Sequence, residues 1–205
     1  MDFETFPMTA PADLFPFLPL KILVAGGFGV GKTTLVTAVS EITPLRTEAL
    51  LTTASTGIDS LVGIESKTTT TVAMDFGRIS FPEEGLRLYL WGTPGQDRFW
   101  FMWDELSKGA VGAVVLVDTR RLPDSFPAVE FFLDRNVPFI VGINEFAGAR
   151  HSYTPDAVRE ALDLPATVPV VLCDARSPAS VTDVLIAVVE HTLRRPSPRR
   201  LTPAS

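Results

Sequence analysis

A glycine-rich segment that ends in a lysine and two hydroxyl side chains is the clearest chemical feature of the sequence. Residues 26–34 read GGFGVGKTT and satisfy the pattern G-x-x-x-x-G-K-[ST], between an apolar run and a helical pattern. Glycines let the backbone turn its N–H groups inward around phosphates, and the N-terminus of the following helix favours an anion. Lys32 would neutralise the β- and γ-phosphates, and the Thr33 hydroxyl can ligate Mg²⁺. The residues expected to surround the phosphates are Gly26, Gly27, Phe28, Gly29, Val30, Gly31, Lys32, Thr33 and Thr34.

Two further segments contain residue types suited to sensing a third phosphate. TTTTVAMDFG (68–77) follows a long connection, so one of its threonines can bind Mg²⁺ when that loop becomes ordered. GTPGQDRF (92–99) contains Gly95, whose N–H can approach a γ-phosphate, and Gln96, which can orient an attacking water. The alternatives are that the threonines simply favour a strand and that Gln96 is an ordinary surface glutamine.

Apolar runs that predict buried strands alternate with helical patterns along the chain. Strands are expected at 20–27, 71–81, 86–91, 111–118, 137–144 and 168–174, and helices at 32–41, 124–135, 154–162 and 179–195. A PEEG turn joins the second and third strands as a hairpin. The order predicts an α/β fold with a doubly wound, mostly parallel sheet and one antiparallel hairpin.

Composition narrows the class of protein. The chain has 205 residues, of which 46% are hydrophobic, so it is long enough for one folded domain. Its formal net charge of −6 argues against nucleic acid as a partner, because phosphate backbones attract basic surfaces. One cysteine, no basic and apolar leader and no long apolar run predict a cytoplasmic protein without a membrane span.

The domain limits follow from shifts in composition. We expect an N-terminal extension at 1–17, one nucleotide-binding domain at 18–193 and a basic flexible tail at 194–205. The tail is either a solvated end or a contact for anionic lipid or an acidic partner. Residues 42–70 form a long threonine-rich connection, which inside a compact domain is usually functional.

The sequence resembles the Ras-like small GTPases, more narrowly the bacterial MglA-like branch, and most closely the conservon GTPases of actinomycetes. The stretches that carry the resemblance are TTVAMDFGRI (70–79), WGTPGQDRFWFMWDEL (91–106) and GAVVLVDTRR (112–121), and it covers roughly residues 18–193. It implies a small-GTPase-like P-loop fold that binds GTP or GDP with Mg²⁺ and hydrolyses GTP slowly. Roadblock/LC7-type dimers and a membrane sensor-kinase-like protein are the implied partners, which would bring the protein to the inner face of the membrane.

The resemblance also implies residue roles. Thr71 would be the switch threonine and, with Thr33, a Mg²⁺ ligand, with Thr70 as the alternative if the register differs by one residue. The implied catalytic residues are Lys32, Thr71 and Gln96, and Gly95 belongs to the second switch. The base would contact Asn144 of an N-K-x-D-like motif and residues Asp174, Ala175 and Arg176 of CDAR (173–176), with the Ala175 N–H meeting a base carbonyl.

Three positions depart from the family pattern. Gly92 replaces the aspartate that holds Mg²⁺ through water, and losing such a group typically costs about 10–100-fold in metal affinity or activity. In NEFA (144–147), Ala147 removes the carboxylate that reads guanine, and Glu145 replaces a lysine that covers the base. Base specificity is therefore open, and an ATP-using protein and a nucleotide-bound scaffold with little turnover remain alternatives.

A run of five bulky residues, 99–103, follows the second switch segment. If this run is helical, five consecutive residues sweep the whole circumference, so part of it faces outward as a docking surface unless another segment covers it. Arg46 and Arg98 are the candidates for an arginine that acts in cis on the phosphates, or are ordinary surface arginines.

Overall fold

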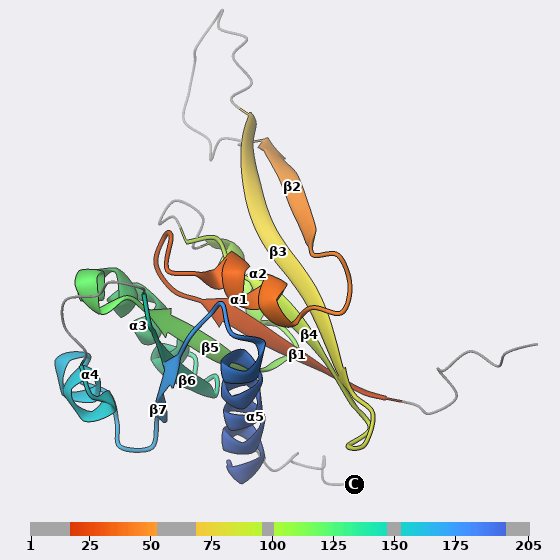
Figure 1. Ribbon diagram of the computed structural model, residues 1–205. Helices are drawn as coiled ribbons and strands as arrows, with labels where there is room; N and C mark the ends of the chain where they lie inside the picture. Colours follow the sequence, from red (N-terminus) through yellow and green to blue (C-terminus); the bar gives the residue numbers. More distant parts are fainter. Residues whose placement is uncertain (1–16, 53–68, 96–100, 147–152, 196–205) are drawn as a thin grey trace, which may run out of the picture.

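A seven-stranded sheet with helices on both faces forms the body of the protein (Figure 1). The computed structural model describes residues 17–52, 69–95, 101–146 and 153–195, and it describes 45–52 and 69–73 by their backbone alone. The strands are β1 (Leu18–Ala25), β2 (Leu45–Thr52), β3 (Thr69–Phe81), β4 (Leu86–Gly92), β5 (Ala110–Val117), β6 (Phe139–Asn144) and β7 (Val170–Cys173). The helices are α1 (Lys32–Val39), α2 (Phe101–Ser107), the 3₁₀ segment η2 (Thr119–Ser125), α3 (Phe126–Asp134), α4 (Pro155–Ala161) and α5 (Pro178–Arg194).

The strand order is β2-β3-β4-β1-β5-β6-β7, with parallel pairing from β4 to β7 and the predicted antiparallel hairpin between β3 and β4. The α/β fold class is confirmed. One strand was not predicted: β2 lies inside the connection 42–70 and pairs antiparallel with β3, which adds a second antiparallel pair. β2 and β3 form a ribbon that extends beyond the body of the sheet (Figure 1).

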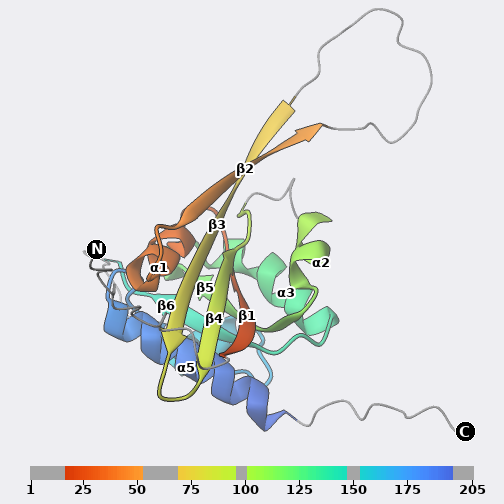
Figure 2. The ribbon, with the colours of Figure 1, turned by 90° about the vertical axis from the view of Figure 1, so that its right-hand side faces the viewer.

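The second half of the central strand β1, Ile22–Ala25, is buried on both faces, which explains its unbroken apolar sequence. Ile22 and Val24 pack under α1 and α5, whereas Leu23 and Ala25 pack with α2, α3 and α4. Figure 2 shows α2 and α3 on the opposite side of the sheet from α1 and α5. Successive residues of β1 therefore face opposite layers, so the strand is held from both sides just before the glycine-rich loop.

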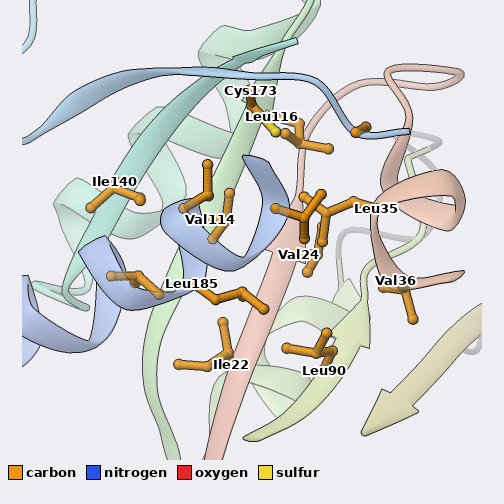
Figure 3. Packing of buried hydrophobic residues seen from close by; sticks show 14 of the residues in the cluster. Ile22, Val24, Leu35, Val36, Leu90, Val114, Leu116, Ile140, Cys173 and Leu185 are labelled. Carbon is orange, nitrogen blue, oxygen red and sulfur yellow. The ribbon is translucent and has the colours of Figure 1, made fainter. Parts of the chain in front are cut away.

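The core on the α1–α5 face holds the helix that follows the glycine-rich loop. Leu35 of α1 points toward Val24 of the sheet, and Leu185 of α5 lies near Val114 and Ile22 (Figure 3). Val36 of α1 packs over Gly77 of β3. These side chains are at most 2% exposed, so α1 is anchored along its inner face. A rigidly held α1 in turn fixes the position of its first residue, Lys32.

The ends of the described chain bear on two predictions. Phe17 stacks under the guanidinium of Arg87 at 4.2 Å, and Arg195 donates hydrogen bonds to Asn136. Most of the predicted extension (1–17) and tail (194–205) lies outside the described residues. Among the described helices, none combines the length and apolarity needed to cross a membrane.

Candidate functional site

The glycine-rich loop bridges β1 and α1 as the spacing predicted. Gly26, Gly29 and Gly31 have φ values of +133°, +72° and +107°, a region that residues with a Cβ rarely adopt. At Gly26 a Cβ would also lie 2.4 Å from the carbonyl oxygen of Leu116 on β5. The loop therefore requires glycine both for its backbone shape and for its close approach to the sheet. It borders a cleft of 410 Å³.

Lys32 lies at the bottom of this cleft and is 9% exposed. Its Nζ donates hydrogen bonds to the carbonyl oxygens of Gly26 at 2.9 Å and Gly27 at 2.7 Å. Burial lowers the pKa of Lys32 from 10.5 to about 8, although the charge of Asp75 acts in the opposite direction. Two neutral carbonyl oxygens offset the cost of burying this ammonium group less than an anion would. The site therefore favours binding of an anion beside Lys32.

Gly95 lies directly beside this ammonium group. A Cβ at Gly95 would be 2.5 Å from Lys32 Nζ and 3.0 Å from the carbonyl of Gly27. The structure thus brings the second switch segment to the glycine-rich loop, as the sequence predicted. Gln96 and Arg98, which follow Gly95, lie outside the described residues.

Asp75 of β3 is a site residue that the sequence analysis missed. The hydroxyl of Thr33 donates a hydrogen bond to Asp75 Oδ2, and both residues line the cleft. Thr93 adds a hydroxyl that is buried and has no hydrogen-bond partner in the described part of the chain. The available signal was an acidic residue flanked by apolar residues within the strand, in AMDFG (73–77).

The oxygen groups around Thr33 fit a magnesium ion. Mg²⁺ prefers oxygen ligands and is usually held by one or two carboxylates together with substrate phosphates. Here a hydroxyl and a carboxylate are in contact, and the buried Thr93 hydroxyl is unpartnered beside them. In the described ranges no three His, Cys, Asp or Glu side chains come together as a metal site, so phosphates would have to complete the coordination.

Thr71 and Arg46 lie in the β2–β3 ribbon, where only the backbone is described. Thr71 pairs with Leu50, and Thr70 with Leu51. Four residues of extended strand, about 13 Å, separate Thr71 from Asp75. In this structure Thr71 therefore lies along the ribbon and not beside Asp75, and its role as a metal ligand stays a prediction.

Asn144, at the end of β6, ties the glycine-rich loop to the segment CDAR. Its Nδ2 donates to the carbonyl of Val30 at 2.8 Å, and its Oδ1 accepts from the N–H of Ala175 at 3.1 Å. The structure thus brings together the residues expected at the base. The Ala175 N–H is already bonded to Asn144, so a base carbonyl would have to share or replace that bond.

Asp174 and Arg176 form an ion pair at the same end of the site. Arg176 donates to Asp174 Oδ1 at 2.8 Å and to Oδ2 at 2.9 Å. This side-chain hydrogen bond lowers the pKa of Asp174 and raises that of Arg176. Glu145 is exposed, and Ala147 lies outside the described residues.

The 3₁₀ segment η2 supports the glycine-rich loop from the β5 side, which the sequence analysis did not foresee. Arg121 donates a hydrogen bond to the carbonyl of Phe28 at 2.9 Å. A Cβ at Gly27 would lie 2.8 Å from Cβ of Asp124, so glycine is needed for this close packing. The Phe28 side chain itself is 65% exposed.

The aromatic run is divided between core and surface. Trp103 is 2% exposed, packs edge-on against Phe131 and donates from Nε1 to the carbonyl of Pro94 at 3.1 Å. Trp103 is therefore on the inward-facing part of the run, where Phe131 of α3 packs against it. Phe101 is 63% exposed, whereas residues 99 and 100 lie outside the described part.

These features define a P-loop nucleotide-binding fold of the small-GTPase-like kind. Residues 24–195 match the family ATP_bind_1, described as a conserved hypothetical ATP binding protein, and the chain belongs to that family. It is 27% identical over 128 residues to the uncharacterized protein MJ1339 of Methanocaldococcus jannaschii, covering 62% of this chain and 70% of that protein.

Solved structures with the same fold include G domains of the FeoB iron transporter. The apo cytosolic domain from T. maritima aligns with a TM-score of 0.62 and 16% identity, covering 92% of this chain and 69% of that one. The G domain from Methanococcus jannaschii gives 0.58 and 13%, covering 85% and 98%. The GMPPNP form of the T. maritima domain gives 0.61 and 18%, covering 86% and 65%. The small-GTPase-like fold is confirmed, and the narrower MglA-like and conservon resemblance stays a prediction.

Proposed function

We propose that this protein binds GTP and GDP with Mg²⁺, hydrolyses GTP slowly and acts as a nucleotide-dependent switch. The observation that carries the proposal is the cleft of 410 Å³ in which Lys32, Thr33, Asp75 and Gly95 meet. A buried ammonium group, a helix N-terminus and a hydroxyl–carboxylate pair together suit a nucleoside triphosphate. Structural neighbours with GDP and GMPPNP forms support a guanine nucleotide.

Each group has a distinct part in this proposal. Lys32 would exchange its two carbonyl partners for phosphate oxygens, and the loop N–H groups would hold the β-phosphate. Bound Mg²⁺, held by Thr33 and Asp75, would neutralise negative charge on the phosphates. Gln96 would orient the attacking water, and turnover without an activator would be slow, well below about 1 s⁻¹.

A second candidate is ATP binding, or nucleotide binding with relaxed base specificity. The description of the family as ATP binding and the exposed Glu145 in place of a lysine favour it. A third, a nucleotide-stabilised scaffold with little turnover, is favoured by glycine at position 92.

The proposed output is docking onto partner proteins, with a Roadblock/LC7-type dimer as the main partner and a membrane sensor-kinase-like protein as a further one. The exposed Phe101, a few residues after the second switch segment, supports a contact surface there. The net charge of −6 supports a protein partner over nucleic acid. We place this activity in the cytoplasm, with the membrane reached through partners.

The first test is the identity of the nucleotide that heat denaturation releases from gently purified protein, followed by phosphate release with Mg²⁺ and GTP. GDP in the extract, with slow turnover that Gln96→Leu abolishes, is the expected result. Lys32→Ala should purify without nucleotide, and this variant is the control for specific retention. Adenine nucleotide in the extract would favour the second candidate, and GTP left intact over hours would favour the scaffold.

A further inference from the structure

The metal-organising carboxylate of this site is missing from position 92, where the family resemblance expects it. We propose that Asp75, from the neighbouring strand β3, supplies that carboxylate and holds the Mg²⁺ of the bound nucleotide together with Thr33. This inference rests on the proposed nucleotide binding and names the metal ligands of the same site.

The register of the sheet puts the two positions face to face. Asp75 pairs directly with Gly92 in the antiparallel β3–β4 ladder, and residues opposite each other on such a ladder point to the same side. A Cβ at Gly92 would lie 3.2 Å from Cβ of Asp75 and 3.4 Å from its Oδ2. The Asp75 carboxylate therefore borders the space that a side chain at position 92 would enter, and a side chain there would crowd it.

The carboxylate also has the contacts that a metal-organising group needs. Asp75 Oδ2 accepts the hydrogen bond of the Thr33 hydroxyl, so the two oxygens are already adjacent. The negative charge of Asp75 acts on Lys32, which places it within electrostatic reach of the group that would neutralise the phosphates. Asp75, Thr33 and Lys32 line one cleft, together with the unpartnered buried hydroxyl of Thr93.

A single carboxylate is sufficient for such a site. Mg²⁺ bound to a nucleotide typically takes one or two protein carboxylates and completes its shell with phosphates and water. Across the described residues no group of three His, Cys, Asp or Glu forms a separate metal site that would compete with Asp75. Glycine at position 92 is thus the complement of aspartate at position 75, and the metal site is relocated by one strand.

The test measures how much Mg²⁺ is needed to tighten the binding of a fluorescent, non-hydrolysable GTP analogue, N-methylanthraniloyl-GMPPNP. Asp75→Asn keeps the shape of the side chain and its hydrogen bond with Thr33 but removes the charge. It should raise the half-maximal Mg²⁺ concentration by about 10–100-fold without weakening binding in EDTA, where the lost charge no longer has a metal ion to hold. Asp183→Asn, on the exposed side of α5, is the charge-matched control and should behave as wild type.

The second part of the test is the double variant Asp75→Gly/Gly92→Asp, which moves the aspartate from position 75 to position 92. Removing the Asp75 side chain removes the two nearest contacts of a Cβ at position 92, and the next nearest atom, the Asp75 backbone oxygen, lies at an ordinary 3.5 Å. The double variant should recover most of the Mg²⁺ dependence that Asp75→Gly loses.

The possible outcomes separate this inference from the proposed function. An unchanged Mg²⁺ requirement in Asp75→Asn, or an equal loss of affinity in EDTA and in Mg²⁺, would overturn the metal role of Asp75 and leave nucleotide binding intact. Failure of the wild type to bind the analogue under any condition would overturn the proposed function, and this inference with it.

Discussion

The buried lysine of the glycine-rich loop should make the nucleotide-free protein more stable at high pH. The pKa of Lys32 falls from 10.5 to about 8, a difference of about 2.5 units. One pKa unit corresponds to about 1.36 kcal/mol, so keeping Lys32 charged costs the native state about 3 kcal/mol. Below pH 8 Lys32 is protonated in both states and this cost is fully present.

Stability rises with pH wherever the unfolded chain binds more protons than the native one. Between pH 8 and 10.5 the unfolded lysine is protonated and the native one is not, so the cost is progressively relieved. The free energy of unfolding of wild type, taken relative to Lys32→Met, should therefore rise by about 2–3 kcal/mol between pH 7 and pH 10. Other titrating groups, including the buried Cys173, cancel in this difference.

The assay is urea unfolding of both proteins in EDTA without nucleotide, at several pH values from 7 to 10. A pH-independent difference between the two proteins would refute the reasoning, because the lysine would then be charged at no cost. With nucleotide bound, the phosphates favour the charged form, so affinity for GTP should weaken as pH rises above about 8. Opposite pH trends in stability and affinity would link the cost of burying Lys32 to its binding role.

Two further predictions concern packing and backbone shape. Trp103→Ala should lower the free energy of unfolding by about 3–5 kcal/mol in urea titrations, whereas Phe101→Ala, also in α2 but exposed, should change it by about 0.5 kcal/mol or less; equal effects would contradict the division of the aromatic run. Gly26→Ala should abolish nucleotide binding in a fluorescence titration, because the Cβ would collide with the Leu116 carbonyl at a φ of +133°. Gly85→Ala, with a φ of +64° but open space around it, should cost about 1–2 kcal/mol of stability and leave binding unchanged.

The glycine-rich loop, the buried strands and a helix cap could be predicted because residues close together in the sequence determine them. The glycine-rich loop has its glycines, lysine and threonine at fixed spacing within nine residues, and the pattern itself specifies the turn and the helix start. The apolar strands could be located because a strand segment buried on both faces is a continuous apolar run, as in Ile22–Ala25 of β1 and Phe139–Ile143 of β6. Thr154 caps α4 by accepting from the N–H of Ala157, a contact that spans only three residues.

β2 was missed for the opposite reason. Residues 45–52, LRTEALLT, show no clear alternation of apolar and polar side chains. The strand lies at the edge of the sheet and pairs only with β3. Its formation depends on a partner that is distant in the sequence. The burial of each residue in the aromatic run could not be predicted either, because it depends on which side of α2 faces α3. In the structure Trp103 packs against α3, whereas Phe101 faces outward.

The sequence by itself determined the glycine-rich loop and the α/β fold, and the family resemblance marked glycine at position 92 as a departure from the expected metal-binding pattern. Only the tertiary structure showed which carboxylate lies against that position. Asp75 and Gly92 lie on different strands, and their contact exists because the β3–β4 ladder aligns them in register. A sequence motif specifies side chains within one turn or strand, whereas a carboxylate that reaches across a sheet depends on pairing between strands.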